Sequence, residues 1–158
     1  MKTIFPKKEC HIPKWFVIDA KGKTLGRLAT ESSKLLTGKE TSLFTPGVDQ
    51  GNFVVIVNAN QIEVTGQKEL QKLYYRNSQR PGSLKIETFK SLKERIPTRI
   101  LERAIWGMLP KNILGRNYFR RLHVYVDSKI PYKKSKDGTQ QMISLDSLDQ
   151  TKWIKVDL

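Results

Sequence analysis

Cysteine and histidine, the residues that most often build disulfides, zinc sites and nucleophilic centres, are nearly absent from this chain. One cysteine, Cys10, and two histidines, His11 and His123, occur among 158 residues. A single cysteine excludes an intrachain disulfide and favours a reducing compartment. Three such side chains argue against a zinc site and exhaust the obvious nucleophile and base candidates. We therefore predict that the chain carries no metal or other cofactor and is not an enzyme.

Long apolar runs are also missing. No stretch reaches the roughly 18 residues that a membrane-spanning helix needs. The first six residues lack the apolar region of a signal peptide and are too few for a transit peptide. We therefore predict a soluble protein, either made where it works or already processed.

Acidic residues are scarce relative to basic ones. The chain has 15 Asp and Glu against 29 Lys and Arg, which gives a formal net charge of +14. Such a surface repels itself until something anionic lies against it. Nucleic acid is the first candidate for that partner, and an anionic membrane surface is the second.

A glycine-rich phosphate loop is lacking at the place where the chain comes nearest to one. Gly22-Lys23-Thr24 lies between a predicted strand and a predicted helix, but the motif needs a glycine where the sequence has Val17. Without that glycine, backbone amides cannot wrap a nucleotide phosphate, so we predict no small-molecule substrate. A single phosphate of an RNA backbone at that helix start remains open. A ligand crevice in a parallel sheet also remains open, because fold alone does not define function.

Strand and helix patterns alternate in the first half of the chain. The apolar runs at 15–19 and 53–57 predict buried strands, and 62–64 predicts another short strand. Between the first two, the apolar stripe of 25–36 predicts a helix that Gly38 ends. Strand, helix and strand in this order favour a right-handed crossover in a parallel sheet.

Composition sets the predicted boundaries. Residues 1–14 are basic and contain two prolines, which predicts an extended lead-in. Residues 15–127 form a single α/β domain. Residues 128–158 are polar and predict a C-terminal tail on the surface. The last residues, 154–158, alternate with period two, so they form either a short edge strand or a contact with a neighbour.

The middle of the chain combines aromatic and basic residues. Residues 65–75 predict a short helix, 84–87 a brief strand and 88–96 an amphipathic helix. Two adjacent tyrosines are interleaved with cations: Tyr74 and Tyr75 among Lys68, Lys72, Arg76 and Arg80. An aromatic face stacks an unpaired base while cations bind its phosphates. We expect one of the two tyrosines to pack in the core instead.

The stretch 99–126 predicts a helix, a turn at Pro110, a second helix and a last core strand at 124–126. The first helix, which Gly107 and Pro110 break, has a predicted buried side of Ile100, Leu101, Ala104, Ile105 and Met108. Its opposite side carries Arg99, Glu102, Arg103 and Trp106. Either RNA or a neighbouring protein covers that tryptophan, which we favour, or it lies beneath the two arginines as a cation–π pair.

The second helix repeats this division. Asn112 is its predicted N-cap. Its apolar stripe consists of Leu114, Tyr118 and Leu122, and Arg116 and Arg120 lie one turn apart on the other side. Two adjacent helices that bury one side and present arginine on the other predict contact with phosphates.

The same stretch carries a resemblance to a known family. Gly107-Met108-Leu109-Pro110, then Gly115-Arg116, then Leu122-His123-Val124-Tyr125-Val126 resembles the signature of the bacterial-type ribosomal protein L13 family of the large subunit. The likeness extends back to Trp15 and covers about 15–126. Residues 80–87 and 95–99 are most similar to plastid and cyanobacterial members.

The resemblance implies a three-layer α/β/α sandwich on a mostly parallel four-stranded sheet. It implies a structural constituent of the large ribosomal subunit that binds and organises large-subunit ribosomal RNA during assembly and so supports translation. The implied partners are that RNA and neighbouring large-subunit ribosomal proteins, with no membrane. The implied location is the ribosome in the plastid stroma or, alternatively, in the bacterial cytoplasm.

The predicted RNA contacts are the cations and aromatics of these segments. They are Lys23, Arg27, Lys68, Lys72, Tyr74, Tyr75, Arg76, Arg80, Arg99, Arg103, Trp106, Lys111, Arg116, Arg120 and Arg121. Two rival functions are a nucleotide-using enzyme, which needs a phosphate loop and a metal-binding acid, and a general DNA-binding protein.

Overall fold

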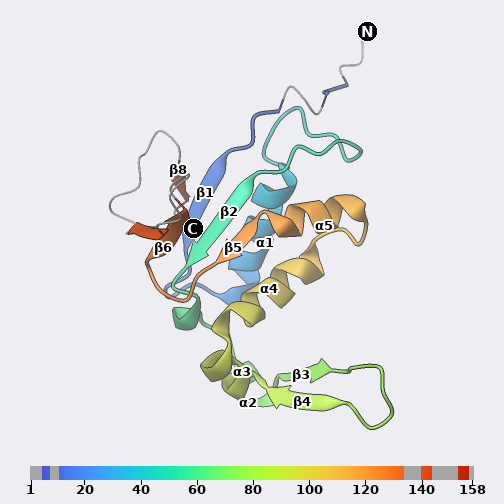
Figure 1. Cartoon of the computed structure of the whole chain (residues 1–158), viewed down its shortest axis with the longest axis vertical. Helices are drawn as coiled ribbons and strands as arrows, with labels where there is room; N and C mark the ends of the chain where they lie inside the picture. Colours follow the sequence, from blue (N-terminus) through green and yellow to red (C-terminus); the bar gives the residue numbers. More distant parts are fainter. Residues whose placement is uncertain (1–4, 8–10, 134–139, 144–152, 157–158) are drawn as a thin grey trace.

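The computed structural model describes residues 5–7, 11–133, 140–143 and 153–156. Figure 1 shows a sheet with helices packed on it and, at the lower end of the view, a smaller unit of helices and a hairpin. The two parts share helix α4 (Pro97–Met108), which contacts both α1 and α3.

Four parallel strands form the sheet. They are β1 (Trp15–Asp19), β2 (Phe53–Val57), β5 (Leu122–Val124) and β8 (Trp153–Val156), in the order β5-β2-β1-β8. Every neighbouring pair is parallel, which confirms the predicted α/β class and parallel sheet. Strand β8 takes the edge beside β1, so the edge strand is confirmed for 153–156, and 157–158 lie outside the described residues.

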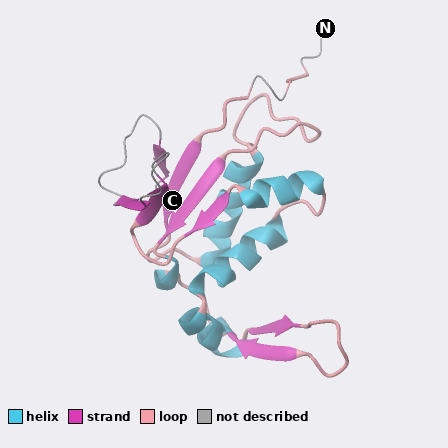
Figure 2. Ribbon diagram, in the orientation of Figure 1, coloured by secondary structure: helices cyan, strands magenta, loops and turns pink. Residues whose placement is uncertain are grey.

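One face of the sheet forms the main core with helices. Side chains alternate between the two faces of a strand, and Phe16 and Ile18 of β1 point to the helical side. There they pack with residues of α1 (Leu25–Thr37), α4 and α5 (Ile113–Arg120). Figure 2 shows these helices together on one side of the sheet.

The other face of the sheet has a separate apolar cluster. Val17, Val55 and Val57 are almost fully buried there and pack with Ile130 of β6 (Ile130–Lys133). Strand β6 pairs antiparallel with β7 (Gln140–Ile143). Within the described ranges, β6 and not a helix therefore supplies the layer on this face.

Gly38 ends α1, as the sequence predicted. Its φ is +76°, and its N–H donates to the carbonyl oxygen of Leu35 at 3.1 Å. A Cβ at this position would lie 2.3 Å from the carbonyl oxygen of Gln50. Glycine is therefore required here both for the left-handed backbone and for space.

The smaller unit contains a hairpin that the sequence patterns did not predict. Its elements are α2 (Lys68–Gln71), β3 (Leu73–Arg76), β4 (Lys85–Thr88) and α3 (Phe89–Arg95). The predicted helix over 65–75 is wrong in its second half, because β3 pairs antiparallel with β4. Adjacent tyrosines favour a strand when a partner strand is available, and a local helical pattern does not reveal that partner. The strand predicted at 84–87 is confirmed as β4, shifted by one residue.

One further prediction from the first half needs correction. The strand predicted at 62–64 is absent: after the short helix η2 (Ala59–Gln61), Glu63 makes one isolated bridge to Thr24. Ile62 is buried in the main core. The apolar character that suggested a strand therefore reflects this burial.

Two boundaries in the second half also differ from prediction. Gly107 does not break α4, which continues through Met108 and ends before Leu109-Pro110. Strand β5 begins at Leu122, not at Val124, because α5 ends at Arg120. Leu122 still packs against the main core, but from the strand.

His123 lies in β5 and has a structural environment, as expected. Its ring lies 6.0 Å from that of Trp15, which stacks on Phe53 at 4.3 Å. Burial lowers the pKa of His123, because desolvation disfavours the charged imidazole.

This lowered pKa predicts a loss of stability in acid. Below the ordinary histidine pKa of about 6.5, the unfolded chain binds a proton that the folded chain resists, so the free energy of unfolding falls as pH decreases. Urea unfolding of the native chain and of His123→Gln, measured above and below that pH, should show a smaller decrease for the variant. Equal decreases would contradict the assignment.

Candidate nucleic-acid interface

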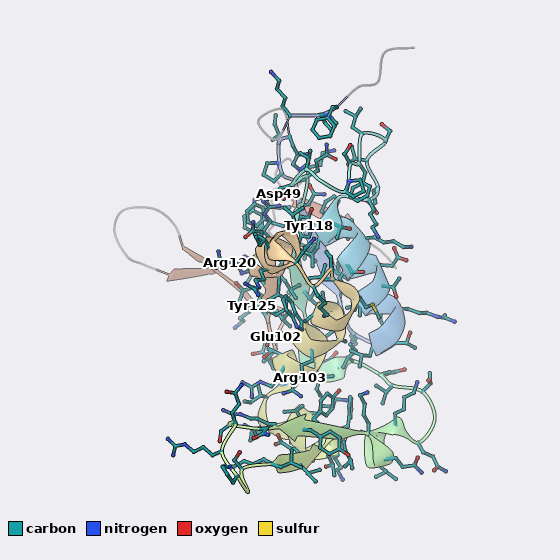
Figure 3. The ribbon with its side chains drawn as sticks, turned by 90° about the vertical axis from the view of Figure 1, so that its right-hand side faces the viewer. Asp49, Glu102, Arg103, Tyr118, Arg120 and Tyr125 are labelled. Atoms are coloured by element: carbon teal, nitrogen blue, oxygen red, sulfur yellow. The ribbon has the colours of Figure 1, made fainter. Side chains whose placement is uncertain are left out.

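The outer side of α4 carries the predicted arginine face. Ile100, Leu101 and Ile105 are fully buried, whereas Arg103 is exposed and Arg99 is partly buried. Figure 3 faces this surface and labels Glu102 and Arg103 of α4 with Arg120 of α5. The division of α4 into two sides is therefore confirmed, except that Met108, predicted to be buried, is 46% exposed.

Trp106 lies in this face and packs against α5. Its ring meets that of Phe119 edge to face at 5.1 Å. Among the described residues, the cation over the indole is Lys111, whose Nζ lies 4.7 Å from the ring and donates to the Trp106 carbonyl oxygen. The predicted cation–π pair thus involves Lys111 and not Arg99 or Arg103.

Trp106 and Phe119 also line a shallow groove of about 290 Å³. Arg99, Glu102 and Arg103 complete its lining. Two aromatic side chains beside two cations and a single acid form a surface that fits a base with its phosphates. Coverage of Trp106 by RNA or a neighbouring protein stays a prediction.

The hairpin brings the two tyrosines to α4. Tyr74 is partly buried, 6.4 Å from the ring of Phe89, and burial raises its pKa. Lys72 and Arg103 place cations 5.5 Å and 5.7 Å from the Tyr74 ring. Tyr75 is 56% exposed, so one tyrosine packs inward and one faces out, as expected.

Arg103 joins the hairpin to α4 directly. Besides its position over Tyr74, its Nη1 donates to the carbonyl oxygen of Tyr75 at 3.3 Å. This contact draws together predicted site residues that are far apart in sequence. Those that share a recorded contact or a lined cavity are Lys72, Tyr74, Tyr75, Arg76, Arg99, Arg103, Trp106 and Lys111.

The remaining predicted cations lie on other elements, apart from Arg80, which lies in the turn of the hairpin. No ring or ion contact within the described ranges joins them to the hairpin cluster. Exposed among them are Arg27, Lys68, Arg80, Arg116 and Arg120, and partly buried are Lys23 and Arg121. Their RNA contacts stay predictions.

Arg121 forms an ion pair inside the domain. Its Nη1 and Nη2 each lie 2.7 Å from a carboxylate oxygen of Asp49, and Nη1 also donates to the carbonyl oxygen of Gly51 at 2.8 Å. The Asp49 side chain is 5% exposed and that of Arg121 is 21% exposed. The Asp49 carboxylate also accepts a hydrogen bond from the Gly51 N–H at 3.2 Å, a contact typical of a turn. The ion pair was not predicted.

Sequence reasoning also missed two cations at the hairpin, Lys85 and Arg95. Lys85 lies directly opposite Arg76 in the β3–β4 register. Arg95 forms a bidentate pair with Glu87, with Nε at 2.8 Å and Nη2 at 2.7 Å. The hydrogen bond from Arg95 holds the pKa of the Glu87 carboxyl below its usual value. The hairpin register would have identified Lys85 as a neighbour of Arg76, but the sequence patterns did not predict the hairpin.

No described helix has the length and apolar character needed to cross a bilayer. No described group of three or more His, Cys, Asp and Glu side chains is placed to hold a metal ion.

Comparisons with known proteins show the family to which the chain belongs. A family model described as Ribosomal protein L13 matches residues 13–131. The large ribosomal subunit protein uL13 of Prochlorococcus marinus is 56% identical over 131 residues, 83% of this chain and 87% of that protein. Proteins of the same name from a Synechococcus and a Picosynechococcus species are 51% and 52% identical, over 89% and 84% of this chain and 94% and 87% of their own.

The chain belongs to the ribosomal protein L13 family, whose members are structural ribosomal proteins and not enzymes. The resemblance seen in the sequence is thereby confirmed, as is its leaning toward cyanobacterial members. The matched range, 13–131, contains the whole of 15–126, over which the resemblance was traced.

Proposed function

We propose that the chain is a structural constituent of the large ribosomal subunit that binds and organises large-subunit ribosomal RNA during assembly. The observation that carries the proposal is the surface formed by the outer sides of α4 and α5 and by the β3–β4 hairpin. Cations crowd this surface, while of its acids Glu87 is already paired with Arg95 and Glu102 lies in the groove with Arg99 and Arg103. Large-subunit ribosomal RNA and neighbouring large-subunit proteins are the partners, in the plastid stroma or the bacterial cytoplasm.

The proposal rests on charge neutralisation. Where several RNA segments meet, their phosphates repel one another, and a protein face of Lys and Arg lowers that repulsion as it displaces counterions. The aromatic rings of Tyr75 and Trp106 provide faces on which unpaired bases stack. The surface thus supplies both elements of single-stranded RNA recognition.

Salt dependence of binding tests this directly. Affinity for a large-subunit ribosomal RNA fragment should fall with salt, with a log–log slope of about −0.7 to −0.9 per phosphate neutralised. Substituting both Arg116 and Arg120 of α5 by Ala should reduce the steepness of that slope by about 1.5 and leave the melting temperature unchanged. Filter binding over a salt series measures it.

The control removes two exposed lysines outside this surface, Lys21 and Lys39, by substitution with Ala. It should change the slope less than the α5 pair. Equal slopes for the two double variants, or equal affinity of the native chain for duplex DNA, would contradict the proposal. Co-sedimentation of a tagged chain with large subunits in a sucrose gradient is the expected result in cells.

A further inference from the structure

A small cavity between the hairpin and helices α3 and α4 has an unusual lining. Its volume is about 60 Å³. Five cations and one carboxylate line it: Arg76, Lys85, Arg95, Arg99, Arg103 and Glu87. Figure 1 shows the hairpin beside α3, at the end of the molecule away from the sheet.

The charges of this cavity are not balanced within the described residues. Glu87 is occupied by Arg95, which binds both of its carboxylate oxygens. Arg99 and Arg103 also attract Glu87, but at longer range. One carboxylate is therefore the counter-charge for several cations, so the cavity has an excess of positive charge.

The hairpin itself contains a repulsive pair. Arg76 and Lys85 lie directly opposite each other across β3 and β4, and both are exposed. Like charges at directly opposed positions destabilise an antiparallel pair of strands. A two-stranded hairpin is only marginally stable to begin with. An anion held between the two side chains would replace this repulsion with two attractions.

The cavity has the size and the donors for a single phosphate. Its volume of about 60 Å³ is small beside the 290 Å³ of the groove at Trp106, which favours a single small anion as its occupant. Guanidinium groups match phosphate oxygens with paired donors. Arg103 is held in place beforehand by its bond to the Tyr75 carbonyl oxygen, so less side-chain freedom is lost on binding.

We propose that this cavity binds one phosphodiester group of ribosomal RNA, held by Arg76 and Lys85 from the hairpin and by Arg99 from α4. The bound phosphate ties the hairpin to α4, because its oxygens accept from both elements. This inference rests on the proposed function and locates one of its phosphate contacts. It also explains why a hairpin would retain two opposed cations.

Reversing the charge of Lys85 separates a binding role from a structural one. In the isolated chain, Lys85→Glu pairs with Arg76 and removes the repulsion, so the melting temperature should stay equal or rise. With ribosomal RNA, the same variant should bind more weakly, and its salt slope should be shallower by about 1. Lys90→Glu, the same charge change on an exposed α3 residue outside the cavity, is the matched control.

A lower melting temperature for Lys85→Glu, or equal RNA binding by the Lys85 and Lys90 variants, would overturn the cavity assignment. If the native chain binds ribosomal RNA no more tightly than duplex DNA, the proposed function itself is overturned. In that event, thermal melting in inorganic phosphate and in chloride at the same ionic strength tests the cavity without RNA. Phosphate should raise the melting temperature of the native chain and not that of Lys85→Glu. Equal shifts for the two proteins would refute the site.

Discussion

Replacing Arg121 with Ala should lower the free energy of unfolding by about 3 kcal/mol. The substitution leaves the Asp49 carboxylate, which is 5% exposed, without the guanidinium that binds both of its oxygens. A buried charge stripped of its partner costs more than the pair contributed, because the remaining ion keeps its desolvation penalty. Urea unfolding followed by circular dichroism measures the difference.

Arg120 provides the matched control, since it is the preceding residue and is exposed on α5. Arg120→Ala should change the free energy of unfolding by no more than about 0.5 kcal/mol. Adding Asp49→Asn to Arg121→Ala should recover part of the loss, because the uncompensated charge is then gone. Comparable losses for the Arg120 and Arg121 variants would show that the pair does not hold the loop to α5.

Gly115→Ala is the second substitution with a large expected effect, a loss of about 2 kcal/mol or more. A Cβ at Gly115 would lie 1.8 Å from the carbonyl oxygen of Pro110, a backbone atom that cannot move aside alone. The same residue donates its N–H to the Asn112 side chain at 2.9 Å, the predicted cap of α5. Any shift that relieves the clash therefore disturbs the cap as well.

Gly107 offers the comparison, because it lies in α4 and an added Cβ would meet nothing within 4 Å outside its own helix. Gly107→Ala should stabilise the chain by about 0.5–1 kcal/mol, the usual gain of alanine over glycine in a helix. Thermal melting of the two variants should thus shift in opposite directions. A neutral Gly115→Ala would mean that the turn at Pro110 is looser than its geometry indicates.

The sheet could be predicted from sequence because its signals are local. Strands β1 and β2 are unbroken apolar runs, and α1 has a helical stripe ended by a glycine. The hairpin could not be predicted, because the residues of β3 fit a helical pattern and their partner strand, β4, begins nine residues farther along. The edge strand predicted over 154–158 was one of two alternatives for the same reason: β8 pairs with β1, which lies far away in the sequence.

The candidate site divides in the same way. The arginine face of α4 follows from helical periodicity, so Arg99 and Arg103 were found from their spacing. Arg121 has a similar basic context, but its partner Asp49 lies far away in sequence, and no local pattern distinguishes a paired cation from a free one. Lys85 was missed because its importance depends on the register of a hairpin that had not been predicted.

The strand order β5-β2-β1-β8 has a consequence for biosynthesis. Strand β1 is translated well before its neighbour β8, which lies far downstream in the sequence. Until β8 has been made, one edge of β1 therefore has unpaired peptide groups that can recruit a foreign strand. The pairing of β1 with β8 is a long-range step, so the nascent polypeptide should depend on chaperones or on prompt delivery until β8 emerges.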